Sequence, residues 1–197
     1  MIFKALKLKN TVDDSAFDAL YPEWIQKLAE RHWTPVQIAL LAADYLADKP
    51  QKKILDIGSG AGKFCLVGAL STEGRFYGIE QRESLIKLSR EIAVKNNIDN
   101  VEFIHSNINE VSFACYDAFY FYNSFFENLD GSYPIDKTIK RKSELYYSYS
   151  AYVKKQLAET SAGTRLVTFW SNRDEIPESF DLDFSYGGVL HFWKKRH

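Results

Sequence analysis

The sequence predicts an α/β fold, with a doubly wound, mainly parallel sheet of seven strands, a closing antiparallel hairpin and helices on both faces. Three observations carry this prediction. From residue 52 onward, short apolar runs alternate with stretches of helical period, which is typical of right-handed βαβ units. The first apolar run leads directly into a glycine-rich loop. Near the C-terminus, two strand-like runs are separated by Gly187-Gly188, which indicates a hairpin.

The first third of the chain is predicted to be helical. Asp14 can cap a short helical turn, and Pro22 suits the first position of the next turn. Thr34-Pro35 repeats this signal, with a hydroxyl N-cap followed by proline at the first helical position. The helix that follows is expected to end at Lys49-Pro50, because the residue before a proline is pushed out of the helical region.

The remaining elements follow from the changes of period along the chain. The predicted strands cover residues 53–57, 75–79, 101–105, 116–122, 163–170, 180–185 and 189–194. The predicted helices between them cover residues 64–70, 84–96 and 143–160. The chain has 197 residues and no Pro/Gly/Ser linker, so one domain is expected. Residues 1–50 would form an N-terminal helical cap on a Rossmann-like core at residues 51–197.

Composition and charge narrow the function classes. The formal net charge is -1, which gives no support to a protein that grips a nucleic-acid backbone. Cys65 and Cys115 lie in apolar surroundings and are expected to be buried free thiols, without metal-ligand spacing, so no metal is expected. The lysine-interrupted N-terminus lacks the apolar region of a signal peptide, and no apolar run has membrane-spanning length. A cytoplasmic location is therefore expected.

The most informative segment is the glycine-rich loop after the first strand. Residues 54–64 read Ile-Leu-Asp-Ile-Gly-Ser-Gly-Ala-Gly-Lys-Phe. A nucleotide P-loop is excluded, because it would require glycine where Ile57 stands and Ser or Thr where Phe64 stands. The dinucleotide fingerprint G-x-G-x-x-G fits less well, because Lys63 occupies the position of its third glycine. A dinucleotide-binding loop with this one departure stays open.

The same loop fits a third ligand without departure. Asp56, Gly58, Gly60 and Gly62 after an apolar strand resemble motif I of the class I S-adenosylmethionine-dependent methyltransferases. The resemblance extends over about residues 34–197 at the level of architecture. It implies that the glycines, with Ser59 between them, pass under the methionine part of the cofactor. It also implies that Asp56 helps to hold the amino-acid end of the cofactor through hydrogen bonds.

Two further strand ends carry cofactor-binding candidates. Glu80 ends the second strand, where a carboxylate can accept both ribose hydroxyls of an adenosine, and Gln81 follows it. Glu80 fits NAD equally well, so hydride transfer stays open at this point, although the closing hairpin favours the methyltransferase fold. Asn107 follows the third strand where the family usually has an acid, and its amide oxygen can meet the adenine amino group.

The end of the fourth strand is where the resemblance places the reacting groups. Asn123 and Phe126 match the outer positions of the family's [DN]-P-P-[YF] motif for methylating amide or amine nitrogens, but Ser124 and Phe125 replace its prolines. Asn123 is therefore a weak catalytic candidate as well as a cofactor-binding candidate. No dedicated general base is expected, because the sulfonium of the cofactor already activates the methyl group.

Two flanking segments bear on the methyl acceptor. Residues 32–35 resemble the segment that covers the cofactor in several of these enzymes, which makes Thr34 a cofactor-binding candidate. Lys140 and Arg141 belong to a basic loop that is either a solvated surface or a contact for nucleic acid or an acidic partner. We expect methyl transfer to a protein side chain or a small molecule, ahead of nucleic acid. The alternatives are an NAD-dependent oxidoreductase and a non-catalytic module that binds S-adenosylmethionine.

Overall fold

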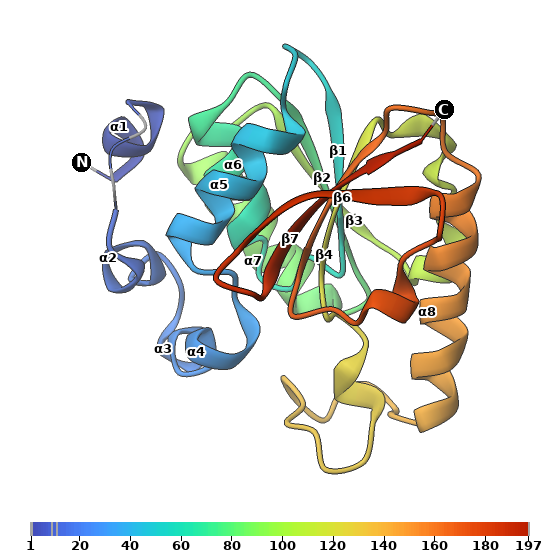
Figure 1. Cartoon of the computed structure of the whole chain (residues 1–197). Helices are drawn as coiled ribbons and strands as arrows, with labels where there is room; N and C mark the ends of the chain where they lie inside the picture. The colour runs from blue at the N-terminus through green and yellow to red at the C-terminus, as the bar shows by residue number, and fades with distance from the viewer. Residues whose placement is uncertain (1, 9, 11, 197) are drawn as a thin grey trace.

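The computed structural model describes residues 2–8, 10 and 12–196, and its centre is one seven-stranded sheet in the order β3-β2-β1-β4-β5-β7-β6 (Figure 1). The strands are β1 Lys53–Ile57, β2 Arg75–Glu80, β3 Val101–His105, β4 Ala118–Tyr122, β5 Arg165–Phe169, β6 Phe180–Tyr186 and β7 Leu190–Lys195. Strands β1 to β5 are parallel, whereas β7 runs antiparallel to both β5 and β6. The predicted parallel sheet with a closing hairpin is confirmed.

The central strands are apolar because both of their faces are buried. In β4, Ala118 and Tyr120 join the hydrophobic cluster on one face of the sheet, and Phe119 and Phe121 join the cluster on the other face. A parallel strand covered on both sides reads as a continuous apolar run instead of an alternating one. This explains why the sequence of β4 excludes an exposed edge.

Helices cover both faces of the sheet, as predicted. The helices α5 Val36–Leu46, α6 Lys63–Ser71 and α7 Glu83–Lys95 lie on one face, and α8 Ser143–Ala158 lies on the other (Figure 1). The connection from β3 to β4, which the structure describes in full, contains two 3₁₀ turns, Ile108–Glu110 and Phe113–Cys115, and no α-helix. The second face is therefore covered more thinly.

The described residues of the N-terminal segment form four short helices, α1 Ile2–Lys7, α2 Asp14–Asp18, α3 Glu23–Gln26 and α4 Ala29–His32. Their side chains Leu6, Phe17 and Ile25 are fully buried in the same cluster that covers the sheet. The helical cap is thus packed onto the core. The division at residue 50 stays a prediction.

Two predicted helix caps are wrong. The side chain that caps α2 is Asp13, which accepts from the peptide N–H of Ser15 at 2.8 Å, instead of Asp14. The Thr34 hydroxyl does not cap α5, because it lies 2.9 Å from the hydroxyl of Tyr120. Asp14, which lies 22 residues earlier in the sequence, bonds to the first turn of α5 instead: its Oδ1 accepts from the N–H of Val36 at 2.8 Å.

The two cysteines differ in exposure, which corrects the expectation that both are buried. Cys65 is fully buried within α6, whereas Cys115 ends a 3₁₀ turn and is exposed. We expect iodoacetamide to alkylate Cys115 in the native protein and Cys65 only after denaturation, because burial raises the pKa of the Cys65 thiol and blocks access to it. Peptide mass mapping checks this, and alkylation of Cys65 in the folded protein would contradict it.

Candidate functional site

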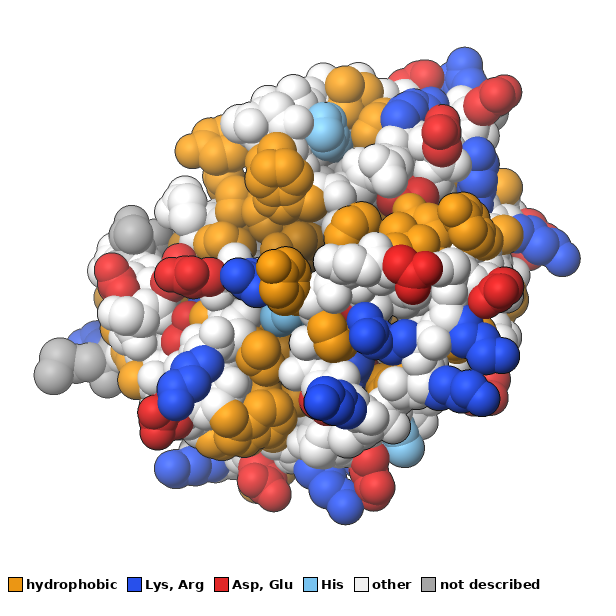
Figure 2. All heavy atoms as spheres, turned by 90° about the horizontal axis from the view of Figure 1, so that it is seen from below, with side chains coloured by type: hydrophobic (Ala, Val, Ile, Leu, Met, Phe, Trp, Pro, Cys, Tyr) orange, Lys and Arg blue, Asp and Glu red, His pale blue; other side chains and the backbone are white. Residues whose placement is uncertain are grey.

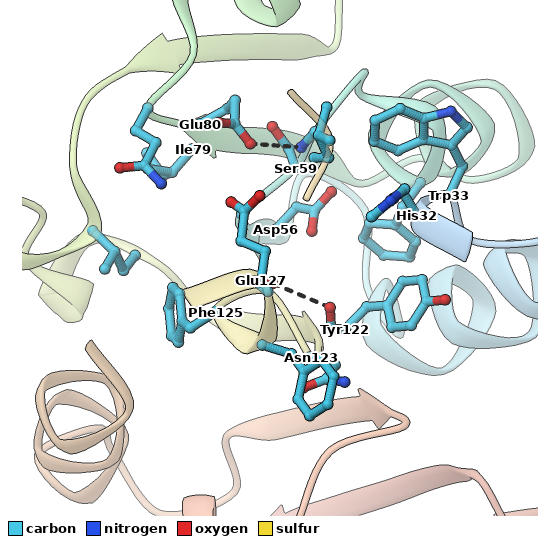
Figure 3. Close-up of a pocket in the computed structure, with 18 of the residues that line it drawn as sticks. His32, Trp33, Asp56, Ser59, Ile79, Glu80, Tyr122, Asn123, Phe125 and Glu127 are labelled. Atoms are coloured by element: carbon cyan, nitrogen blue, oxygen red, sulfur yellow. Dashed lines mark hydrogen bonds between the residues drawn. The ribbon is translucent and has the colours of Figure 1, made fainter. Parts of the chain in front are cut away.

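A cavity of about 520 Å³ opens at the carboxyl ends of the parallel strands, a size typical of small-molecule sites (Figure 3). Nine of the ten predicted cofactor-binding residues line it: Thr34, Asp56, Gly58, Ser59, Gly60, Glu80, Gln81, Asn107 and Asn123. The tenth, Gly62, is absent from the lining. The fold therefore brings together residues that are up to about 90 positions apart in the sequence.

The structure requires glycine at positions 60 and 62 of the loop for different reasons. Gly60 has a φ of +53°, and a Cβ there would lie 2.4 Å from Cζ3 of Trp33, so the missing side chain lets the indole cover the loop. Gly62 has a φ of +78° and directly precedes α6. A Cβ on Gly62 would lie 2.6 Å from the ring of Phe103. Gly62 therefore allows α6 to pack closely against β3, away from the cavity wall.

Glu80 lies at the end of β2 with its carboxylate buried in the cavity wall. Its Oε1 accepts from the peptide N–H of Arg82 at 2.8 Å, and its Oε2 accepts from the N–H of Gly60 at 3.2 Å. Burial raises the pKa of Glu80, and the charge of Arg82 opposes that shift. A carboxylate can accept about four hydrogen bonds, so two such sites are left for a ligand.

Asp56 and Ser59 are buried polar groups of the cavity wall that have few protein partners among the described residues. Asp56 is 4% exposed as a residue, and its carboxylate accepts from the Cys65 thiol at 3.4 Å. Burial raises the pKa of Asp56 to about 7, although the thiol contact lowers it and nearby Glu80 raises it further. Among the described residues, no group bonds to the buried Oγ of Ser59. Buried polar groups in native proteins usually have partners, so this wall suits a polar ligand.

Asn107 has a local structural role at the edge of the cavity. Its Oδ1 accepts from the N–H of Asn109 and so caps a 3₁₀ turn, while its Nδ2 donates to the hydroxyl of Tyr149 at 2.7 Å. The rings of Tyr149 and Phe125 lie 5.4 Å apart beside it. Sequence reasoning did not assign Tyr149 to the cofactor site, because α8 follows β4 by a long connection.

The segment after β4 forms the opposite wall. Asn123 has a φ of +41°, a left-handed conformation that asparagine tolerates better than most residues, and its N–H donates to Ser171 Oγ. The hydroxyl of Ser124 donates to the carbonyl of Ile57 and so joins this segment to the end of β1. Asn123 and Phe126 both line the cavity, as the prediction for the end of the fourth strand requires.

The rim of the cavity is aromatic and exposed. Phe126, Tyr133 and Trp170 line the cavity and are 46%, 67% and 59% exposed. The guanidinium of Arg31 lies 4.1 Å from the ring centroid of Tyr133. Figure 2 looks at the face below the sheet and shows hydrophobic side chains gathered there with basic side chains between them. Such a rim suits a planar partner.

Sequence reasoning also missed two buried cations in the cavity wall, Arg82 and Lys63. Both residue types are exposed by default, so their burial signals a structural or functional requirement. The available signal was position, since Arg82 follows Glu80 by two residues and Lys63 directly follows Gly62.

Within the described part of the chain, no helix is long and apolar enough to cross a membrane.

Comparison with known proteins bears on the identity of this site. Residues 48–167 match the family model described as a methyltransferase domain. Over 67 residues the chain is 36% identical to a 23S rRNA uracil-C5 methyltransferase of Shewanella sediminis, covering 34% of this chain and 15% of that protein. It is also 36% identical over 61 residues to an arsenite methyltransferase of Halobacterium salinarum, covering 30% and 16%. The chain thus matches less than a fifth of either relative's length.

A solved structure supports the same fold. An RNA methyltransferase from Salinibacter ruber in complex with S-adenosylhomocysteine aligns with a TM-score of 0.56 and 22% identity, over 83% of this chain and 94% of that one. The family match decides between the two cofactors that an acidic residue at position 80 left open. The chain belongs to the class I S-adenosylmethionine-dependent methyltransferases.

Proposed function

We propose that the cavity at the ends of β1, β2 and β4 binds S-adenosylmethionine and presents its methyl group to a planar small molecule at the aromatic rim. The observation that carries the cofactor part is the pair of buried carboxylates, Asp56 and Glu80, on neighbouring strand ends, with the unpartnered Ser59 hydroxyl between them. Asp56 would bind the amino group of the cofactor. Glu80 would accept from its ribose hydroxyls through its remaining acceptor sites.

The other cofactor contacts follow from the same geometry. Asn107 would meet the adenine, with Phe125 and Tyr149 packing beside the ring. Gln81 and Thr34 would complete the wall. When bound, the cofactor supplies an activated methyl group, so the protein has to align the acceptor and exclude water. Trp33 covers the glycine loop and contributes to that exclusion.

The acceptor is inferred from the rim, because the relatives named above act on different acceptors. Trp33, Tyr122 and Phe126 line the cavity, whereas Lys140 and Arg141 do not. The guanidinium of Arg141 donates to the Glu127 carbonyl and to Ser132 Oγ inside its own segment. These features favour a planar small molecule over a phosphate-bearing chain. The side chain of Asn123 would accept a hydrogen bond from the nitrogen atom that receives the methyl group.

Nucleic acid is the second candidate, supported by the exposed rings of Tyr133 and Trp170 and by the rRNA and RNA methyltransferases among the similar proteins. Transfer of a radiolabelled methyl group to aromatic amines and heterocycles, to peptides and to total RNA distinguishes the acceptors. Label in RNA that falls steeply with added salt would favour nucleic acid. Label in peptides would favour a protein side chain.

Tight NAD binding in calorimetry, with no response to S-adenosylhomocysteine, would contradict the cofactor assignment.

The affinity for S-adenosylhomocysteine should depend on pH through Asp56. Its raised pKa of about 7 leaves much of the carboxyl group protonated below neutrality, and an ammonium binds the ionised form more strongly. The dissociation constant should therefore fall as the pH rises from about 6 to about 8, by at most about tenfold per pH unit. Calorimetry measures this trend. Asp56→Asn, which cannot ionise, should bind S-adenosylhomocysteine more weakly, and its dissociation constant should change less with pH. An equal slope in that variant would show that a group other than Asp56 causes the pH dependence.

A further inference from the structure

Arg82 lies between the two halves of the cavity and contacts both. Its side chain is 2% exposed. Nη1 and Nη2 donate to the two carboxylate oxygens of Glu127 at 2.9 and 2.6 Å, and Nε donates to Asp136 Oδ1 at 3.2 Å. Nη1 also lies 3.6 Å from Oε1 of Glu80. Figure 3 shows the Glu127 carboxylate pointing from the segment after β4 toward Glu80.

Two of the acids that meet Arg82, Glu127 and Asp136, come from one long segment, residues 123–142, which connects β4 to α8. This segment supplies the acceptor side of the cavity, including Asn123 and Phe126. It contains no α-helix, and it hangs below the sheet as the yellow loop of Figure 1. A segment of this length with only one short 3₁₀ turn, Phe126–Asn128, needs specific contacts to hold one conformation.

The charges around Arg82 make its guanidinium difficult to replace. Glu80, Glu127 and Asp136 place three carboxylates within 4 Å of one cation. Without the cation, the carboxylates would repel one another in a poorly solvated site. A planar guanidinium can bind Glu127 in a bidentate manner and still donate to Asp136, whereas an ammonium cannot match this geometry.

We propose that Arg82 is a positioning residue that holds residues 123–142 over the cofactor cavity. Its side chain binds the acceptor side through Glu127 and Asp136, while its peptide N–H binds the ribose side through Glu80. The two halves of the site are thereby built around one residue. The assignment of these halves to cofactor and acceptor rests on the proposed function, but the contacts themselves do not.

Hydrogen exchange of the protein without ligand tests the positioning role. In Arg82→Met and Glu127→Gln, we expect amide exchange within residues 123–142 to accelerate at least about tenfold, with β1 and β4 unchanged, because breaking a buried ion pair releases the segment that it holds. Arg82→Lys should fall between wild type and Arg82→Met. The matched control is Arg165→Met, which removes an arginine paired with Asp48 at 3.3 Å at the opposite end of the sheet.

Calorimetry with S-adenosylhomocysteine separates this proposal from the function. Glu127→Gln leaves the peptide contact to Glu80 intact, so its dissociation constant should rise less than that of Glu80→Ala while the segment loosens. Exchange in residues 123–142 that is unchanged in both Arg82→Met and Glu127→Gln would overturn the positioning role. A wild-type protein that fails to bind S-adenosylhomocysteine, with the exchange effects present, would instead contradict the cofactor assignment and leave the role of Arg82 established.

Discussion

Replacing Glu80 with alanine is expected to weaken the binding of S-adenosylhomocysteine by about 1.5–3 kcal/mol, roughly tenfold to 150-fold in dissociation constant. The carboxylate is buried at the end of β2, and hydrogen bonds from ribose hydroxyls to an ionised acceptor in such a site are stronger than those between neutral groups. Isothermal titration calorimetry near pH 8 measures the effect, since burial raises the pKa of Glu80 and an alkaline buffer keeps the wild-type group ionised.

The control for this prediction is Glu83→Ala, which makes the same change in charge three residues later. Glu83 is exposed and pairs with Lys87 at 3.0 Å on the surface of α7. Its loss should leave the dissociation constant unchanged, because exposed pairs contribute little and distant surface charges are screened. Circular dichroism checks that both variants are folded. An unchanged dissociation constant in a folded Glu80→Ala protein would show that the ribose lies elsewhere.

Much of the fold was predictable from local patterns in the sequence. A parallel strand that is buried on both faces, such as β4, appears in the sequence as an apolar run between two turns. The hairpin of β6 and β7 is indicated by Gly187-Gly188. The cavity was predictable for a related reason. Residues at or just after the carboxyl ends of successive parallel strands, such as Asp56, Glu80 and Asn107, meet at one edge of the sheet whatever the details of packing.

The errors lie where a side chain chooses between a local and a distant partner. Thr34 has the sequence context of a helix cap, but its hydroxyl bonds to Tyr120, 86 residues away. Asp14 could cap its own helix, but it accepts from the N–H of Val36 instead. Such choices depend on tertiary contacts that local propensity does not encode. The burial of Arg82 is a similar case, because its three acidic partners become neighbours only after folding.

Lys63→Met should destabilise the protein by about 3–5 kcal/mol, because the substitution removes one partner of a buried ion pair and leaves the other charged. Lys63 Nζ lies 2.7 Å from Asp18 Oδ1 and 2.6 Å from Asp14 Oδ1, and the side chains of Lys63 and Asp18 are 3% and 9% exposed. These bonds join α2 to the start of α6. In a chain of this size the loss corresponds to a fall in Tm on the order of 10 °C, measurable by differential scanning calorimetry.

Two comparisons make this prediction specific. Lys27→Met, at an exposed pair with Glu23 of the same 2.7 Å length, should change stability by less than about 1 kcal/mol. Lys63→Met combined with Asp18→Asn should recover part of the loss, because no buried charge is then left without a partner. Burial already raises the pKa of Asp18, and Lys63 opposes that shift.

The pH dependence of this loss has a definite sign. Without Lys63, the pKa of Asp18 in the folded protein should rise further above its unfolded value, since the opposing charge is gone. A carboxyl group with a raised folded pKa binds its proton more tightly in the native state, so it lowers stability as the pH rises above the unfolded value. The deficit of Lys63→Met relative to wild type should therefore be smaller near pH 5 than near pH 8. A deficit that is the same at both pH values would mean that lost packing of the lysine stem, and not the unpaired carboxylate of Asp18, causes the instability.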